Sequence, residues 1–222
     1  MKRKGLFFAA LALNWLALFF AVWRMPEQIP MHVNIDGIVD GMGPKWPLLG
    51  LGALPVAIFL LFLALPRIDP LRESWQKHEK AFERVALAIL LFLALLGWLV
   101  ASLAFAGNAL GSAVSFRFEA LICAGVGLLF LVIGNYMGQV RQNWFFGIRT
   151  PWTMASEAVW RKTHRAGGYA FVGCGALCLV GVALGLFTGL FWLEILLVVA
   201  PVLLAAIWLT AYSYLLFKKE QQ

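Results

Sequence analysis

The residues best suited to chemistry lie in a basic and aromatic segment, residues 138–167, which we call the inner loop. Its candidate ligands for an anion are Arg141, Arg149, Arg161 and His164. Guanidinium groups bind phosphate well because they donate two parallel hydrogen bonds, so a lipid phosphate is one candidate ligand. The alternative, which the residues alone favour, is that the basic residues only mark the cytoplasmic side of a membrane protein. Since the loop has no nucleophile–base pair or metal triad, we expect no enzyme activity.

Aromatic residues are interleaved with these charges, at Trp144, Phe145, Phe146, Trp152 and Trp160. Aromatic and basic side chains together suit the headgroup region of a bilayer. Thr150 and Pro151 break the chain, and Thr153 is predicted to cap a helix that runs to about Arg165. Gly167 is the predicted end of that helix.

A second candidate segment, residues 24–46, places His32, Asn34 and Asp36 on one face of a short extended stretch. Such groups could bind a divalent metal ion. One imidazole, one amide and one carboxylate are a thin ligand set, however. We therefore favour a self-bonded turn structure built on two Asp-Gly dipeptides that begin at Asp36 and Asp40. Neither a metal nor a cofactor is predicted.

Long apolar stretches must position these two segments. A helix needs about 20 apolar residues to cross the hydrocarbon core of a bilayer. The stretches that qualify are 5–23, 47–65, 85–106, 118–137, 168–189 and 193–216. The chain is 62% hydrophobic and only 13% charged, whereas about a quarter of a soluble domain is charged. We therefore predict an all-α integral membrane protein with six transmembrane helices, the last two forming a tight hairpin.

The distribution of Lys and Arg along the chain agrees with this membrane topology. Fifteen of the 18 Lys and Arg residues lie at the two termini or in residues 66–84 and 138–167. The other three are Arg24, Lys45 and Arg117. Lys and Arg gather on the cytoplasmic side of membrane proteins, so both termini are predicted to be cytoplasmic. Because topology accounts for the net charge of +7, we expect no direct binding to nucleic acid.

The other basic segment, residues 66–84, is predicted to be helical, because Asp69 can cap a helix there and a proline follows it. Trp75, His78 and Phe82 then fall on one stripe of that helix. The stripe could lie on the headgroups or receive a partner. The simpler alternative, which we favour, is a plain extension of the third span.

Small residues recur inside the predicted spans. Gly181, Gly185 and Gly189 form two overlapping G-x-x-x-G steps, a spacing that lets helix backbones approach closely. These steps could form a homodimer interface, although packing inside the six-helix bundle is the favoured interpretation. Cys174 and Cys178 are four residues apart and could bind a metal or carry redox chemistry. With no acidic or histidine partner beside them, we expect them to pack as small apolar residues.

Two stretches of the sequence resemble the sequence motifs of one protein family. GNYMGQVRQNWFFGIRTPWTMASEAVWRKTHRAGG, residues 134–168, resembles the signature of the Sdp immunity protein (SdpI) family. IPMHVNIDGIVDG, residues 29–41, resembles an uncharacterised domain that often precedes it. By position, the inner pattern falls on Asn135, Arg141, Asn143, Gly147, Arg149, Pro151, Trp152, Trp160, His164 and Arg165. The outer pattern falls on Pro30, His32, Asn34, Gly37 and Asp40.

The resemblance implies a multi-span protein of the bacterial cytoplasmic membrane that gives immunity to a secreted peptide toxin. It also implies signalling, through an autorepressor held at the cytoplasmic face. On this view residues 1–65 form a two-span unit with an outer motif loop at 24–46, and residues 66–222 form a four-span unit with the inner loop. The alternatives are a membrane carrier or enzyme that handles an anionic lipid or an envelope precursor, and a structural membrane protein without a ligand.

Overall fold

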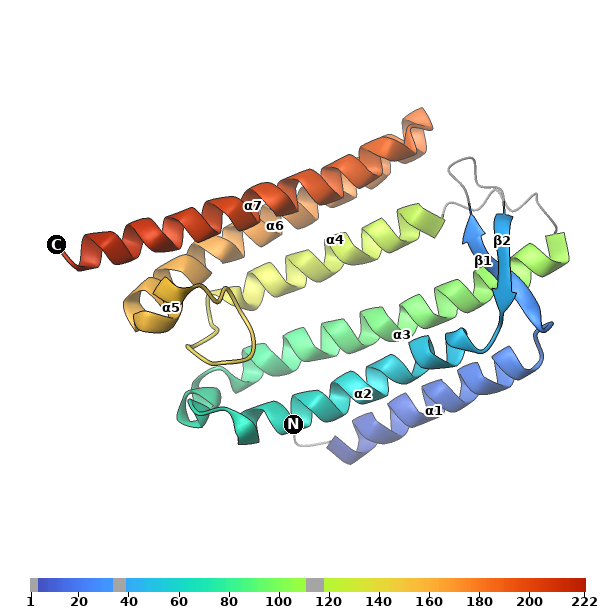
Figure 1. The fold of residues 1–222 in the computed structure, drawn as a ribbon, viewed down its shortest axis with the longest axis horizontal. Helices are drawn as coiled ribbons and strands as arrows, with labels where there is room; N and C mark the ends of the chain where they lie inside the picture. Colours follow the sequence, from blue (N-terminus) through green and yellow to red (C-terminus); the bar gives the residue numbers. More distant parts are fainter. Residues whose placement is uncertain (1–3, 34–38, 111–117) are drawn as a thin grey trace. The chain divides into compact units, whose positions relative to one another are not determined.

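A computed structural model describes residues 4–33, 39–110 and 118–222 of the chain (Figure 1). In chain order, the elements are α1 (Lys4–Trp23), β1 (Gln28–Val33), β2 (Val39–Pro44), α2 (Pro47–Ile68), the 3-10 helix η1 (Arg72–Lys77), α3 (Glu79–Leu110), α4 (Phe118–Met137), α5 (Pro151–Ala155), α6 (Glu157–Thr188) and α7 (Phe191–Glu220). Within the described residues, six helices are long and apolar enough to cross a membrane: α1, α2, α3, α4, α6 and α7. The predicted fold class, an all-α membrane protein with six spans, is confirmed. The orientation of the termini stays a prediction.

The chain divides into two compact units, and the boundaries between them fall inside α2, α3 and α4. The first unit comprises residues 1–61 and 89–121, and the second comprises residues 62–88 and 122–222. The functional division predicted between residues 65 and 66 stays a prediction.

Indole N–H groups join the three helices of the first unit. The indole of Trp15 donates to the carbonyl oxygen of Leu49 at 3.2 Å, which joins α1 to α2. The indole of Trp98 donates to Oδ1 of Asn14 at 2.9 Å, which joins α3 to α1. Both bonds satisfy polar groups that would be costly to leave unpaired in a lipid environment. A buried apolar cluster of this unit consists of Leu18, Val22, Met25, Ile29, Leu48, Ala101 and Ala104.

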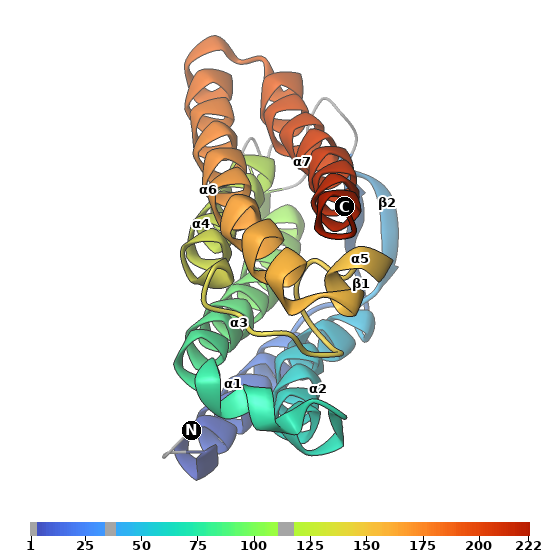
Figure 2. The ribbon, with the colours of Figure 1, turned by 90° about the vertical axis from the view of Figure 1, so that its left-hand side faces the viewer.

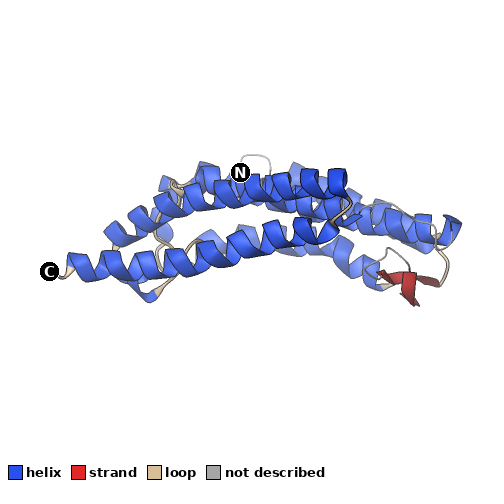
Figure 3. Cartoon of the chain, turned by 90° about the horizontal axis from the view of Figure 1, so that it is seen from above, coloured by secondary structure: helices blue, strands red, loops and turns tan. Residues whose placement is uncertain are grey.

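The first unit also carries an antiparallel hairpin of β1 and β2, which we call the outer hairpin (red in Figure 3). The predicted extended stretch corresponds to β1, but its partner strand β2 was not predicted. Asp40 and Gly41 lie within β2, so the turn predicted at this dipeptide is wrong. Gly41 stands directly opposite His32, and a Cβ there would lie 2.9 Å from Cβ of His32, so glycine allows the two strands to pair closely. The other predicted turn, at Asp36, lies outside the described residues.

Glycines let the helices of the second unit approach closely. A Cβ on Gly134 of α4 would stand 2.7 Å from the carbonyl oxygen of Gly168 on α6. A Cβ on Gly181 would stand 2.8 Å from Cβ of Leu197 on α7. Gly189, whose φ of 75° suits glycine, caps the end of α6, and α7 then returns beside α6 as the predicted hairpin (Figure 2). Gly134 and Gly181 therefore serve packing between helices of one chain, whereas Gly189 ends a helix.

Two local predictions in the inner loop are wrong. Helix α6 does not end at Gly167 but continues to Thr188, because Gly167 is used for close packing: a Cβ there would overlap the side chain of Ile148. Thr153 is not the N-cap either. Thr150 caps the five-residue helix α5, and Ser156 caps α6 by accepting a hydrogen bond from the Val159 N–H.

Residues 66–84 also differ from the predicted single helix. Helix α2 continues to Ile68, η1 follows, and α3 begins at Glu79. The chain turns at Asp69, whose carboxylate accepts the backbone N–H of Leu71 at 2.8 Å. The same carboxylate is engaged by more distant groups, which hold it in the turn rather than at the start of an α-helix.

Candidate functional site

Asp69 links two segments that are far apart in the sequence. Its Oδ2 accepts the indole N–H of Trp75 at 2.9 Å and the backbone N–H of Trp144 in the inner loop at 3.1 Å. The side chain is only 2% exposed, so these charge-assisted bonds offset the cost of burying a carboxylate. The sequence suggested only a capping role for Asp69, because nothing in the local pattern indicates a partner 75 positions away.

An aromatic cluster lies beside this carboxylate. Trp75, His78 and Phe82, the predicted stripe, pack around Phe146 of the inner loop, with ring centroids 5.3 to 5.6 Å from that of Phe146. All three stripe residues are buried. The stripe therefore neither lies on headgroups nor simply extends a span, because the inner loop covers it.

His78 is the polar member of the aromatic cluster. The residue is 2% exposed, and neither ring nitrogen has a hydrogen-bond partner among the described residues. Burial lowers the pKa of His78 below its ordinary value of 6.5, against the opposing influence of the Ser74 backbone and the Asp69 carboxylate. His78 is therefore neutral at neutral pH.

Asn143 shapes the turn that delivers Phe146 to the cluster. Its Oδ1 accepts the backbone N–H groups of Phe145 and Phe146, both at 2.9 Å. Its Nδ2 donates to the carbonyl oxygens of Arg141 at 3.0 Å and Phe146 at 3.1 Å. The amide is fully buried, and four backbone bonds use both its donors and its acceptor. Asn143 is thus a scaffold residue of the inner loop.

Trp160 and His164 form a second buried pair, on α6. Their rings stack with centroids 4.0 Å apart and an angle of 17° between planes. The Trp160 indole donates to the carbonyl oxygen of Val140 at 2.9 Å. His164 donates from Nδ1 to the Trp160 carbonyl at 2.9 Å, which leaves Nε2 to accept the Ile148 N–H at 3.0 Å. This pattern requires the neutral ring and uses both of its nitrogens.

Gly147 completes this contact. Its φ of 109° lies in a region that side chains with a Cβ rarely adopt, and a Cβ there would overlap Nε2 of His164. A Cβ would also stand 3.2 Å from the Trp160 ring. The loop can therefore close onto the stacked pair only with glycine at this position.

The capping box of α5 ties the inner loop to α7. Thr150 accepts the N–H of Thr153 at 3.2 Å, and Thr153 accepts the N–H of Thr150 at 2.9 Å. The Thr150 hydroxyl also bonds that of Ser213 on α7 at 2.9 Å. Thr153 in turn donates to the carbonyl oxygen of Ile148 at 2.8 Å.

The structure sorts the predicted inner-loop residues into three groups by their exposure. Asn143, Trp160 and His164 are buried and hold the loop, whereas Arg141 and Trp152 are partly buried. The exposed residues of the predicted set are Asn135, Arg149 and Arg165. Trp144 and Phe145, which were not in that set, are 49% and 37% exposed beside the turn at Asn143. The binding role of all these residues stays a prediction.

Two motif residues of the outer hairpin are exposed, whereas those that hold the inner loop are buried. Nδ1 of His32 pairs with Oδ1 of Asp40 across the strands, and the two side chains are 70% and 45% exposed. Asn34 lies outside the described residues. Within the described part of the chain, no group of three His, Cys, Asp or Glu residues could hold a metal ion.

Lys45 anchors the base of the outer hairpin, a role that the sequence did not reveal. Its side chain is 4% exposed, and Nζ donates to the carbonyl oxygens of Trp23 at 3.1 Å and Met25 at 2.8 Å. Nζ also lies 3.2 Å from a carboxylate oxygen of Glu27. The Trp23 carbonyl is the last of α1 and that of Met25 lies just beyond it, at the helix end where a cation is favoured.

Six long apolar helices among the described residues define the class: this is a multi-pass membrane protein. Residues 139–213 match the SdpI/YfhL protein family, and residues 9–63 match a domain of unknown function, DUF1648. Immunity protein SdpI of Bacillus subtilis (strain 168) is 28% identical to this chain over 221 residues, which are 99% of this chain and 98% of that protein. No solved structure matches the chain significantly. The predicted resemblance to the SdpI family, with the preceding domain, is confirmed.

Proposed function

We propose that this protein protects its cell against a secreted peptide toxin and reports the toxin by holding a cytoplasmic repressor at the membrane. The observation that carries the proposal is the match along nearly the whole chain to a protein named for immunity. Both matched segments contain a structured motif, the outer hairpin in one and the inner loop in the other. The protein acts by binding rather than by catalysis.

The outer hairpin offers a surface that suits an amphipathic peptide. Met31 and Met42 are 50% and 55% exposed, next to the exposed pair of His32 and Asp40. Methionine is flexible and adapts to varied apolar partners. A two-stranded sheet also has free edges that can pair with an extended peptide. We therefore propose the outer hairpin as the toxin-facing surface.

The inner loop offers the corresponding surface for the repressor. The exposed side chains are those of Trp144, Phe145 and Arg149. The backbone that carries them is held by the Asn143 side chain and by the packing of Phe146 in the aromatic cluster. Tryptophan and arginine are the residues most often found at the energetic centres of protein interfaces. A rigid base reduces the entropy cost of binding.

The alternative, a carrier or enzyme acting on an anionic lipid through this loop, has less support. It requires His164 to face an anion together with the arginines. The ring of His164 is fully buried, and both of its nitrogens bond the backbone.

The test is survival of a strain that lacks its own immunity protein and is challenged with the killing peptide of the family. The variants are His32→Ala with Asp40→Ala for the outer hairpin, and Trp144→Ala with Arg149→Ala for the inner loop. Lys162→Ala, an exposed basic residue of α6 outside the family pattern, is the matched control. All proteins are compared at equal abundance in the membrane.

Wild type and the control are expected to protect and to retain a fluorescent repressor at the membrane. The outer-hairpin variant should lose protection, and the inner-loop variant should release the repressor. A wild-type protein that gives no protection would refute the immunity proposal for this toxin. A repressor that stays at the membrane in the inner-loop variant would refute the role of that surface.

A further inference from the structure

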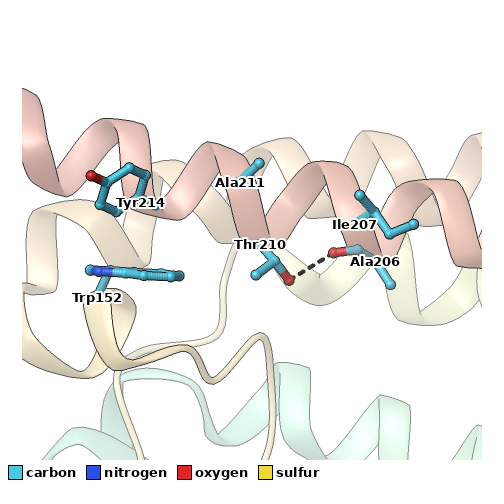
Figure 4. Close-up of a pocket in the computed structure, with 6 residues that line it drawn as sticks. All are labelled: Trp152, Ala206, Ile207, Thr210, Ala211 and Tyr214. Atoms are coloured by element: carbon cyan, nitrogen blue, oxygen red, sulfur yellow. Dashed lines mark hydrogen bonds between the residues drawn. The ribbon is translucent and has the colours of Figure 1, made fainter.

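A groove in the second unit lies outside every contact invoked so far. It runs between α5 and the second half of α7, with a volume of about 650 Å³. Its lining consists of Trp152, Ala206, Ile207, Thr210, Ala211 and Tyr214 (Figure 4). This volume falls within the range of about 300–1,000 Å³ that is usual for small-molecule sites.

Specific contacts between α5 and α7 hold the walls of this groove in place. The bond between Thr150 and Ser213 fixes the start of α5 against α7. Trp152 then stands opposite Tyr214, with ring centroids 5.1 Å apart, at one end of the groove (Figure 4). From there the small side chains of α7, Ala211 and Ala206, leave the space open.

The walls of the groove are apolar. The Thr210 hydroxyl, midway along the wall formed by α7, donates to the carbonyl oxygen of Ala206 at 2.8 Å and is satisfied within its own helix (Figure 4). The remaining polar groups of the lining, the Trp152 indole N–H and the Tyr214 hydroxyl, belong to the two rings at one end of the groove, so the rest of the wall suits hydrocarbon.

The size and shape of the groove favour a lipid chain over another helix. The lining covers residues 206–214, which is about two turns of α7, and its other wall is essentially one indole ring. A transmembrane helix is about 10 Å across and packs along many turns. A single acyl chain is thin enough to fill a space of this kind.

Positively charged side chains lie just beyond the Tyr214 end of the groove, where the headgroup of a bound lipid would be. Lys218 follows Tyr214 by one helical turn on the same face, Lys219 is next to it, and both are exposed. Glu220 follows them and reduces this positive charge without cancelling it. Trp and Tyr side chains prefer the headgroup level, and clustered lysines attract anionic lipids.

We propose that this groove binds one acyl chain of an anionic phospholipid, with the phosphate beside Lys218 and Lys219. The site belongs to the second unit alone and does not depend on the immunity function. It differs from the lipid-handling alternative because the inner-loop arginines and His164 take no part. The bound lipid would fix α5, and with it the inner loop, against α7.

The experiment is native mass spectrometry of the purified full-length protein in mild detergent. Phosphatidylglycerol or phosphatidylcholine with identical acyl chains is added at equal concentrations. Ala206→Leu with Ala211→Leu fills the groove, and Lys218→Gln with Lys219→Gln removes the positive charge. Ala176→Leu, the same change at an exposed position on α6, is the control.

Wild type and the Ala176 control should retain one phosphatidylglycerol molecule in preference to phosphatidylcholine. The groove-filling variant should lose that lipid. The lysine variant should bind phosphatidylglycerol about tenfold more weakly, close to the level of phosphatidylcholine. Equal retention by the groove-filling variant and the control would overturn the proposal. It would equally be overturned if wild type held no lipid and filling the groove converted a dimer into monomers, since a second copy would then be the occupant.

Discussion

The two motif-bearing regions use similar residues in opposite ways. In the inner loop, the side chains of Asn143 and His164 are fully buried, and their nitrogen and oxygen atoms form hydrogen bonds with backbone groups. In the outer hairpin, His32 and Asp40 are paired with each other and largely exposed. The difference shows that the first region is a rigid scaffold with a few exposed side chains, whereas the second is a surface made of its motif residues. Mutations should therefore separate folding from function at the two sites.

The largest effect is expected from Asn143→Ala. This change leaves the Phe145 and Phe146 N–H groups without their partner and frees Phe146 from the aromatic cluster. Loss of several buried bonds should lower the free energy of unfolding by about 2–4 kcal/mol. The measurement is the thermal melting temperature in detergent. Asn135→Ala, at an exposed position of α4, is the control and should melt like wild type. Equal melting of the two variants would refute the scaffold role of Asn143.

A smaller effect is expected from pH, through His78. Its pKa in the folded protein lies below the ordinary value of 6.5, so above that value both folded and unfolded states carry the neutral ring. As pH falls below 6.5, the unfolded state takes up the proton more readily, and stability is lost. The loss should approach but not exceed about 1.4 kcal/mol per pH unit.

The comparison that isolates this effect is wild type against His78→Phe, melted at pH 7.5 and pH 5.5. Phenylalanine fits an aromatic cluster and does not titrate. His164 is unchanged in both proteins, so the difference in their pH dependence reports residue 78. Parallel pH dependence in the two proteins would show that His78 does not resist protonation.

The smallest effect on stability is expected from His32→Gln in the outer hairpin. An exposed ion pair contributes little, so melting should shift by less than about 1 kcal/mol in free energy of unfolding. Protection in the survival assay should nevertheless fall, because the pair forms part of the proposed toxin-facing surface. A large loss of stability would mean that the hairpin, like the inner loop, is a scaffold, and the contrast between the two regions would disappear.

Much of the molecule followed from the sequence. The apolar stretches are long enough to force helices in a bilayer, because lipid offers no partner for backbone N–H and C=O groups. All six predicted spans correspond to helices, and the hairpin of α6 and α7 was expected from the few residues between them. The family resemblance was also found from two short motifs. These features depend on composition and local spacing.

The tertiary structure alone decided what the motif residues do. Trp75 and His78 form a stripe in the sequence, but only contact with Phe146 shows that the inner loop buries them. Asp69 was expected to cap a helix, yet its carboxylate bonds Trp144, 75 residues away. Gly167 carries the signal of a helix end, and a distant side chain, that of Ile148, instead requires the close approach. The physical reason is common to all three: local propensities are worth about 1 kcal/mol or less, and buried long-range contacts outweigh them.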